Sequence, residues 1–327
     1  MNRASPLLAI GLLAACSGRQ SPLAPAGDQA GTLHQLLLLA LVVCGIVYLV
    51  VIAALVWSLM RRSGDENRDG AERRLNRGLW ATGAGIVLGV TILIVGSFLA
   101  DRALFATRGE DALEVRITGH QWWWRIEYRA GGTARWIETA NELHLPRGRT
   151  TRVLLGSADV IHSFWVPNVA GKIDMIPGRR NVLDLTPRQS GWFRGQCGEY
   201  CGMQHAHMAF DVKVEEPAQF ETWLTRQARA ASRVSDSRGL RGQAVFARAC
   251  SACHAVRGTT ASGRAGPDLT HVGARRSIAA GTITMSRGAL QGWIAQPQAL
   301  KPGTSMPAIP LAPADADAVA HYLAGLR

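Results

Sequence analysis

Residues 191–215, GWFRGQCGEYCGMQHAHMAFDVKVE, place a loop rich in metal-binding side chains between two short patterned runs. The loop, 195–208, contains two cysteines, two histidines, two methionines and a glutamate. After it, Phe210, Val212 and Val214 alternate with charged residues, which is the pattern of a half-buried strand. GWFRG before the loop could be the partner strand. The loop is therefore predicted to lie on a rigid β-sheet base.

Thiolate, imidazole and thioether groups are the soft-to-borderline donors that suit copper. Cys197, Cys201, His205 and Met208 lie three or four residues apart, and VIHSFWVP upstream supplies His162. The residue types leave two other interpretations open: a Cys2His2 zinc site, or a disulfide between the two cysteines. Zinc gives Met208 no role, and a disulfide gives none to Met208 or the histidines.

The chain from about residue 105 to 220 consists of short runs rich in Val, Ile and aromatic residues, separated by turn residues. These runs predict an antiparallel β-sandwich or barrel. Three successive tryptophans at 122–124 cannot all face the core of one strand, so at least one should be exposed or at an interface. The clearest runs are LEVRIT (113–118), WWWRIEY (122–128), TRVLLGS (151–157), NVLDLT (181–186) and FDVKVE (210–215).

Two uncharged apolar segments, 33–60 and 79–100, come before this domain. Each exceeds the ~20 residues that a helix needs to cross ~30 Å of hydrocarbon. Neither has the polar stripe of a long soluble helix, so buried core helices are the weaker interpretation. The loop between them, 61–78, carries six arginines against four acidic residues. By the positive-inside rule this loop is cytoplasmic, which places both termini and the later domains on the outer side.

The first 15 residues have the layout of a secretory signal, with Arg3, an apolar run and small residues before Cys16. LAAC (13–16) resembles a bacterial lipoprotein box and predicts a lipid anchor at Cys16, the alternative being an ordinary signal peptide. Cys44, inside the first span, is most simply a small apolar filler. The other four cysteines form two close pairs, and each pair of an exported chain is either a disulfide or a cofactor site.

Residues 237–327 form a further module after a polar, Ala- and Arg-rich segment at 221–236, which is predicted to be a short helix or a linker. Cys250-x-x-Cys253-His254 is the c-type haem attachment pattern, in which both thiols bind the haem and the histidine ligates its iron. KPGTSMP (301–307) offers Met306 as the second axial ligand, and Met285 is the rival. A chance match or a redox pair is the alternative, which the flanking GPDL (266–269) and the helical ending disfavour.

The net charge of +12 is spread over exported segments and does not indicate a nucleic-acid partner. The segment 237–327 holds ten basic and three acidic side chains. Its basic surface suggests acidic partners or anionic lipid, with a merely solvated face as the alternative.

GQCGEYCGMQHAHM, with VIHSFWVPNVAGKIDMIPGR and GHQWWWRIEY, resembles subunit II of cytochrome c oxidase from the first span to about residue 225. The resemblance implies a cupredoxin-type β-barrel that binds the binuclear copper A centre. In it, two cysteines bridge two copper ions, two histidines each cap one, and a thioether and a backbone carbonyl complete them. By position these ligands are Cys197, Cys201, His162, His205, Met208 and the carbonyl of Glu199.

The same resemblance implies that the Glu199 side chain reaches a Mg²⁺ site shared with subunit I, and that electrons arrive at Trp122. His207 and Met203 match no ligand position. One departure concerns the second span, where many relatives have a glutamate three residues before the tryptophan. In this chain that position holds Arg77, three residues before Trp80. The entry route for protons is therefore in doubt, although Glu72, one to two turns away, could substitute for the glutamate.

The module 237–327 resembles a class I cytochrome c, which implies one covalent haem c and a hydrogen bond from His254 to the Pro267 carbonyl. Methionine–histidine ligation raises the haem potential, as a carrier that feeds an oxidase requires. The expected docking face is mainly apolar near Trp122, with salt-sensitive contacts at its rim.

The predicted fold is multidomain: a two-helix transmembrane hairpin, a cupredoxin-like antiparallel β-barrel and an all-α class I cytochrome c. The domains are a signal peptide (1–15), the N-terminal segment with the hairpin (16–104), the copper A domain (105–220), the linker (221–236) and the cytochrome c domain (237–327).

This combination resembles the caa3-type oxidases. It implies electron flow from a separate cytochrome c or an upstream respiratory complex to the haem, through Trp122 to copper A, and on to subunit I for oxygen reduction with proton pumping. The implied partners are subunits I and III and membrane lipid, in a bacterial inner membrane with the cofactor domains on the periplasmic side. A copper-A nitric oxide reductase subunit and a membrane-anchored copper-delivery protein are the alternatives.

Overall fold

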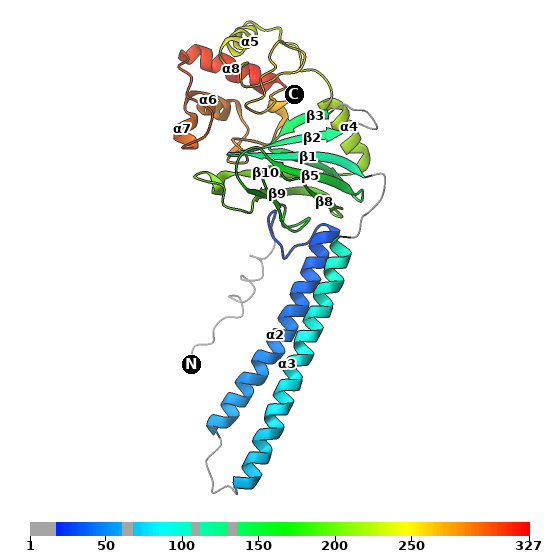
Figure 1. The fold of residues 1–327 in the computed structure, drawn as a ribbon. Helices are drawn as coiled ribbons and strands as arrows, with labels where there is room; N and C mark the ends of the chain where they lie inside the picture. The colour runs from blue at the N-terminus through cyan, green and yellow to red at the C-terminus, as the bar shows by residue number, and fades with distance from the viewer. Residues whose placement is uncertain (1–17, 61–67, 106–111, 130–135) are drawn as a thin grey trace, which may run out of the picture. The chain divides into compact units, whose positions relative to one another are not determined.

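The computed structural model describes residues 18–60, 68–105, 112–129 and 136–327. The predicted signal peptide, Cys16 and the first part of the arginine-rich loop, 61–67, lie outside these ranges, whereas residues 68–78 of the predicted loop form the start of the second helix. The chain divides into two compact units, Gly31–Thr107 and the remainder (Figure 1). Each unit is built by its own sequence pattern, helical in the first and mostly β in the larger part of the second.

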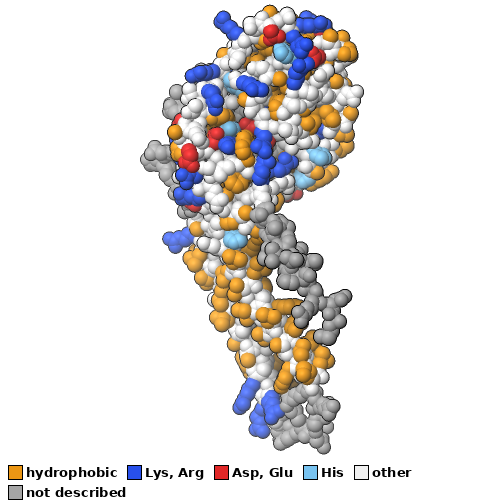
Figure 2. All heavy atoms as spheres, turned by 180° about the vertical axis from the view of Figure 1, so that it is seen from behind, with side chains coloured by type: hydrophobic (Ala, Val, Ile, Leu, Met, Phe, Trp, Pro, Cys, Tyr) orange, Lys and Arg blue, Asp and Glu red, His pale blue; other side chains and the backbone are white. Residues whose placement is uncertain are grey.

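The first unit is made by helices α2 (Asp28–Met60) and α3 (Arg68–Leu104), which contain the predicted spans and extend beyond them. Both are long and apolar enough to cross a membrane. Hydrophobic side chains cover their surface (Figure 2), and such a surface needs lipid rather than water around it. Gly96 of α3 lets the helices approach, because a Cβ there would collide with Leu39 of α2. The two helices fit a membrane anchor.

The β-rich domain of the second unit has two five-stranded sheets that share one hydrophobic core. All five predicted runs form strands, but two neighbouring pairs, β1 with β5 and β10 with β4, are parallel rather than antiparallel. The first sheet runs in the order β3 (Trp136–Ala140), β2 (Trp123–Arg129), β1 (Leu113–His120), β5 (Thr151–Ser157) and β8 (Asn181–Leu185). The second runs in the order β4 (Glu142–Pro146), β10 (Ala209–Glu215), β9 (Gly191–Cys197), β6 (His162–Trp165) and β7 (Ile173–Met175).

Strands β9 and β10 pair antiparallel, as the residues flanking the loop predict, with Gln196 opposite Ala209. Gly195 leaves the space that the Phe210 ring fills, and that ring lies 5.0 Å from the ring of Trp124 and 5.3 Å from that of Phe164. These aromatic side chains are buried and pack directly beneath the ligand-rich loop. The loop therefore starts and ends on two paired strands over a close-packed aromatic core, which restricts its movement.

Strand β10 is more buried than its alternating sequence predicts. Asp211, on the polar face, is 5% exposed and forms ion pairs with Arg19 at 3.1 Å and Arg276 at 3.7 Å. The Ser277 hydroxyl also donates to this carboxylate at 2.5 Å. Arg276 and Ser277 belong to the C-terminal module, so the face expected to meet solvent is covered by another part of the chain.

Helix α4 (Pro217–Gln227) belongs to the β-domain rather than to a linker. Phe220, Trp223 and Leu224 follow one helix face and are all buried in the β-domain core. The Trp223 ring stacks on His144 of β4 with centroids 3.9 Å apart. The segment 221–236 thus begins inside a packed helix, and only 228–236 connects the two modules without regular structure.

The C-terminal module has its own hydrophobic core, separate from that of the β-domain. Helices α5 and α8 cross at Gly242, where a Cβ would collide with the Ala318 carbonyl. The Asp236 side chain caps α5 by accepting from the Gly239 amide at 2.9 Å. The module is helical as predicted, apart from a minimal pair of strands. Its elements are α5 (Ser237–Ala249), η2 (Val272–Ala274), β11 (Ser277–Ile278), β12 (Ile283–Thr284), α6 (Arg287–Ala295), α7 (Pro297–Leu300) and α8 (Pro313–Gly325).

Candidate metal and haem centres

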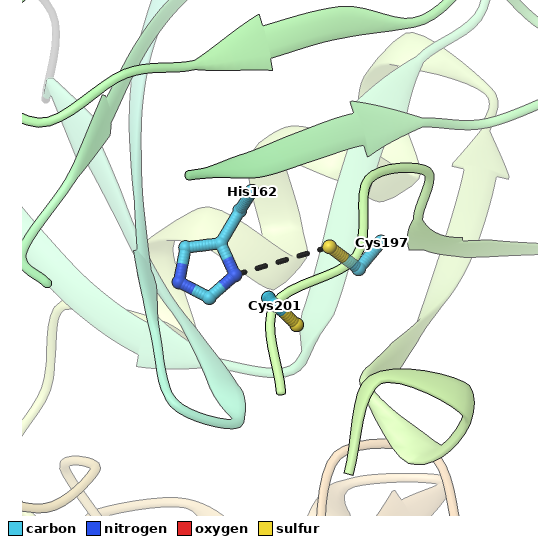
Figure 3. Close-up of side chains that lie close together, drawn as sticks. All are labelled: His162, Cys197 and Cys201. Atoms are coloured by element: carbon cyan, nitrogen blue, oxygen red, sulfur yellow. Dashed lines mark hydrogen bonds between the residues drawn. The ribbon is translucent and has the colours of Figure 1, made fainter. Parts of the chain in front are cut away.

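The ligand-rich loop brings its donors to one buried place at the end of the second sheet. His162 begins β6, Cys197 ends β9, and Cys201 lies in the following loop (Figure 3). Their ligand atoms all lie within 4.8 Å of one another, and the residues are 0%, 2% and 3% exposed. His162 is thus joined to the loop by the pairing of β6 with β9, in which Phe164 lies opposite Cys197.

The remaining predicted donors surround the two thiols. The Cys201 Sγ lies 3.6 Å from His205 Nδ1 and 3.7 Å from Met208 Sδ. The Cys197 Sγ lies 3.8 Å from His162 Nδ1 and 3.1 Å from the Glu199 carbonyl oxygen. The short 3-10 helix η1 (His205–His207) carries His205 toward the cysteines. Every residue that the sequence predicts for this site is therefore brought together.

The chemistry of this donor set fits copper better than the two alternatives. Met208 is fully buried, and its thioether faces a thiol rather than packing only against hydrocarbon. A thioether is a ligand for copper and has no place in a Cys2His2 zinc site. Cys197 and Cys201 are free thiols in this structure, so both sulfurs are available to a metal.

The two thiols influence each other's protonation. A hydrogen bond from Cys201 lowers the pKa of Cys197 to about 3, against the opposing effect of burial. The same hydrogen bond, together with burial, raises the pKa of Cys201. Cys197 is therefore the more readily ionised of the two, and both thiols lose their protons when a metal binds.

Asp159 is a functional residue that the sequence reasoning missed. Its Oδ1 lies 2.8 Å from His162 Nε2, on the side of the ring away from Cys197. Its Oδ2 accepts the Gln121 backbone amide at 2.7 Å. Metal-binding histidines commonly present their second nitrogen to a carboxylate, which fixes the ring and its tautomer. The spacing Asp159-x-x-His162 in SADVIH is the signal that could have identified it.

Asp159 and Cys197 also set the protonation of His162. Burial lowers the pKa of His162, but hydrogen bonds to Cys197 and Asp159 raise it more, so the net shift is upward. The imidazole is thus held between an anion-forming thiol and a carboxylate, both of which favour a fixed ring orientation.

Trp122 lies in the turn between β1 and β2, not within the strand that the sequence predicts. Its indole Nε1 donates to the Cys201 carbonyl at 3.0 Å, and the Gln121 side chain donates to the same oxygen at 2.8 Å. Gly202 has φ +116, and a Cβ there would come within 3.0 Å of the indole. Trp122 is 8% exposed and Trp124 is fully buried, whereas Trp123 is the half-buried member of the three.

The Glu199 side chain pairs with a lysine near the surface. Its carboxylate lies 3.5 Å from Lys172 Nζ, and both side chains are nearly half exposed. Among the described residues, no group of three His, Cys, Asp or Glu ligand atoms gathers around this carboxylate. A metal bound there would need ligands from a partner or from water, as the predicted Mg²⁺ site shared with subunit I requires.

The hydrogen bond that the sequence predicts for His254 is present in the C-terminal module. His254 Nδ1 lies 2.8 Å from the Pro267 carbonyl, which leaves Nε2 for the predicted bond to iron. Burial, the largest effect, lowers the pKa of His254 and favours the neutral ring that a metal binds. Gly266 contacts this ring so closely that a Cβ there would collide with it. Cys250 and Cys253 are free thiols at the end of α5.

The side chain of Gln298 makes three hydrogen bonds to the backbone of the loop that carries Met306. Gln298 Nε2 donates to the Thr304 carbonyl at 2.7 Å and to the Met306 carbonyl at 2.9 Å, and its Oε1 accepts the Gly303 amide at 3.0 Å. Met285, by contrast, packs against the core of the C-terminal module. Met285 is therefore a residue of the module core, and Met306 remains the predicted axial ligand.

Met306→Ala should abolish the optical band of a thioether bound to haem iron and lower the haem potential by a sizeable part of the ~0.8 V range that axial ligands span. The measurement is optical titration of the full-length chain against a series of mediators. Met285→Ala is the matched control and should keep both the band and the potential. If the control loses them and Met306→Ala does not, the ligand is Met285.

Comparison with known proteins agrees with both centres. Residues 129–215 match the family model "Cytochrome C oxidase subunit II, periplasmic domain", and residues 240–327 match the model "Cytochrome c". Cytochrome c oxidase subunit 2 of Alkalihalophilus pseudofirmus is 30% identical over 327 residues, which is 96% of this chain and 94% of that protein. The Bacillus subtilis protein of the same name is 30% identical over 257 residues, 74% of this chain and 71% of that protein.

Among solved structures, the periplasmic domain of subunit II of cytochrome oxidase from Bradyrhizobium japonicum is 32% identical and covers 38% of this chain and 97% of that chain, with a TM-score of 0.35. The two family matches fall on the two modules that hold the donor groups, and the Alkalihalophilus relative is matched along nearly its whole length. The chain therefore belongs to the cytochrome c oxidase subunit 2 family, in the caa3-type form that has a cytochrome c domain fused at its C-terminal end.

Proposed function

We propose that this subunit receives electrons at its cytochrome c domain and delivers them through Trp122 and the copper-binding loop to subunit I, which reduces oxygen to water and pumps protons. Membership of the family makes the chain part of a haem-copper oxidase, in which it associates with subunit I. The observation that carries the proposal is the convergence of six soft or carbonyl donors in a chain that also has a haem attachment sequence.

The roles proposed for the copper-binding residues follow from their chemistry. Cys197 and Cys201 would bridge both copper ions, because only a thiolate has the charge and the lone pairs to bind two soft metals at once. His162 and His205 would each cap one ion. Met208 and the Glu199 carbonyl would complete them as weak ligands. When bound, this centre supplies one-electron transfer at a site whose charge is shared between two metals.

The protein's own contribution is rigidity. Strands β6, β9 and β10 fix His162, Cys197 and the end of the loop, and the aromatic core beneath them leaves little room for movement. Asp159 holds the His162 ring, and Trp122 holds the Cys201 carbonyl. Ligands that stay in place in both redox states keep the reorganisation small, which is the condition for fast electron transfer.

In the cytochrome c domain, Cys250 and Cys253 would attach the haem covalently, and His254 and Met306 would be its axial ligands. The Pro267 carbonyl orients the His254 ring, and Gln298 orients the Met306 loop. A bound haem supplies reversible one-electron chemistry at a potential that the methionine ligand raises. The electron donor is a separate cytochrome c or an upstream respiratory complex.

The proposal also covers the cellular location of the subunit and its further partners. The chain is anchored in a bacterial inner membrane by α2 and α3, with both cofactor domains on the periplasmic side and a lipid anchor at Cys16. Subunit III is a further partner, and a Mg²⁺ ion lies at the contact with subunit I through the Glu199 carboxylate. The exposed Glu199 side chain is consistent with a ligand that is completed by another subunit.

The test is purification of the membrane complex followed by metal analysis and turnover. We expect a copper-to-haem c ratio in this subunit of two to one, and oxygen consumption that depends on it. Turnover of nitric oxide without oxygen turnover would assign the chain to a copper-A nitric oxide reductase instead. Copper without haem c, and no turnover of either gas, would favour a membrane-anchored copper-delivery protein.

A further inference from the structure

Lys301 is a buried lysine with an unusual set of partners. It is 2% exposed, and its Nζ donates to three backbone carbonyls: Trp122 at 2.9 Å, His207 at 2.8 Å and Ala279 at 3.1 Å. No described carboxylate lies within ion-pair distance of this nitrogen. Burial lowers the pKa of Lys301 to about 8, which leaves the side chain mainly protonated at neutral pH.

The three carbonyls come from three segments that are far apart in the sequence. Trp122 belongs to the turn between β1 and β2, and His207 to the copper-binding loop beside Met208. Ala279 follows β11 in the cytochrome c domain. Lys301 itself ends α7 and begins the loop that leads to Met306. One ammonium group therefore joins both sides of the contact between the two cofactor domains.

Neighbouring contacts hold the same loop in place. The Gln204 side chain of the copper-binding loop donates to the Pro302 carbonyl at 2.7 Å, and the Ser305 hydroxyl donates to the Gln121 carbonyl at 3.3 Å. Gly303 packs against Met203. A Cβ added to this glycine would lie 3.9 Å from the Trp122 ring. Near Trp122 the contact between the two domains is thus made by hydrogen bonds to backbone groups. It is less apolar than the docking face that the sequence predicts.

A lysine suits this place better than an arginine. Only three of the 36 basic residues of the chain are lysines, at 172, 213 and 301. A compact ammonium directs its three donors at three carbonyls around one point, whereas the flat guanidinium of arginine spreads its donors in a plane. Charge-assisted hydrogen bonds in a buried place are also the stronger kind.

We propose that Lys301 is a positioning residue that fixes the Met306 loop of the cytochrome c domain over Trp122 and so sets the internal electron-transfer distance. The inference rests on the proposed function, since it assumes that electrons cross this contact. Lys301 joins the start of the loop to the copper-binding domain, and Gln298 holds the far end of the loop from within the cytochrome c domain. The contact is specific, because its acceptors are carbonyls at fixed places in the backbone.

The first test measures the contact itself. In the full-length complex carrying Lys301→Met, the backbone amides of residues 207–209 and 301–305 should exchange with deuterium about tenfold faster or more, because three charge-assisted hydrogen bonds are lost. Lys213→Met is the matched control, since that lysine lies on β10 with its Nζ 4.9 Å from the Trp192 ring centroid. The control should keep native exchange in both segments.

The second test measures the consequence. Flash reduction of the haem in Lys301→Met should show transfer to the copper centre slowed about tenfold, in proportion to the weakened contact. The haem potential, the copper potential and the copper resonance spectrum should stay as in the native complex, which a general loss of structure would not allow. Lys301→Arg keeps the positive charge but not the arrangement of the three donors. It should speed deuterium exchange and slow electron transfer, each by less than Lys301→Met does.

Native exchange and a native internal rate in both Lys301 variants would overturn the proposal. If Lys301→Met does not assemble, the Lys301→Arg measurements decide alone. A failure of the proposed function would be seen differently: the complex without any substitution would lack copper A or show no electron transfer from haem to copper. The exchange measurement needs neither cofactor signal, so it reports on the role of Lys301 in either case.

Discussion

Cys201→Ser is expected to abolish the binuclear copper signal of the subunit and all electron transfer that depends on it. The Cys201 sulfur lies 3.6 Å from His205 Nδ1 and 3.7 Å from the Met208 thioether, at the centre of the buried donor set. A serine hydroxyl is a hard, protonated donor at neutral pH and cannot bridge two soft metals. The measurement is electron paramagnetic resonance of the mixed-valence centre, together with the copper content of the purified complex.

Two further variants test whether the effect is specific to Cys201. Cys44→Ser removes a thiol in helix α2, which supplies no residue to the donor set, and should leave the signal unchanged. Met208→Leu removes only a weak ligand, so it should retain copper but shift the potential of the centre. An unaltered mixed-valence spectrum in Cys201→Ser would refute the copper assignment, since no other described residue offers a second bridging thiol at this place.

Trp122→Ala is expected to slow the internal transfer from haem to copper by roughly ten- to a hundredfold, the usual scale of loss when a partner of a metal ligand is removed. The indole donates to the carbonyl of the ligand Cys201 at 3.0 Å and lies under the loop that leads to Met306. Its removal takes away both the contact with the ligand and the atoms between the two domains. Both cofactors should remain bound, because no donor atom is lost.

The measurement is flash photoreduction of the haem, followed at both centres over a range of enzyme concentrations. The tethered domain should give a rate that does not depend on concentration. Trp123→Ala is the matched control, because that ring stacks on His120 with centroids 4.4 Å apart and has no contact with Cys201. Trp122→Phe separates the two effects, since it keeps a ring but not the indole donor. A native rate in Trp122→Ala would place the electron path elsewhere.

Removal of residues 237–327 would be a less specific test than a point substitution. It would uncover Asp211, remove Lys301 from the Trp122 carbonyl and expose the face of β10. Point substitutions within the contact therefore give clearer results than truncation.

Several features of this protein were determined by the sequence alone. Apolar runs longer than a membrane is thick predicted helices α2 and α3, since a helix satisfies its backbone hydrogen bonds within a single segment in hydrocarbon. Alternating runs predicted five strands, and the spacing of Cys197, Cys201, His205 and Met208 predicted a metal loop. The attachment sequence around Cys250 predicted haem. These signals are local, because covalent geometry limits where side chains a few residues apart can point.

Other features were decided only by the tertiary structure. The short strands β3, β4, β6 and β7 carry little periodicity of their own, and their place depends on pairing with distant strands. The sequence leaves a short helix and a linker as alternatives for 221–236, because the apolar face of α4 has meaning only once the β-domain core lies against it. Parallel pairing of β1 with β5 is likewise set by the course of the chain between them.

The same holds for the residues around the site. Asp159 supports His162, and Lys301 reaches a carbonyl 179 positions away in the chain. Nothing in the local sequence around Lys301 distinguishes a buried lysine from one that lies in solvent. Its acceptors are backbone oxygens, which every residue possesses, so no side-chain pattern marks them. A hydrogen bond of this kind is specified by where folding brings the backbone, and the physical reason is that only the packed structure removes the competing water.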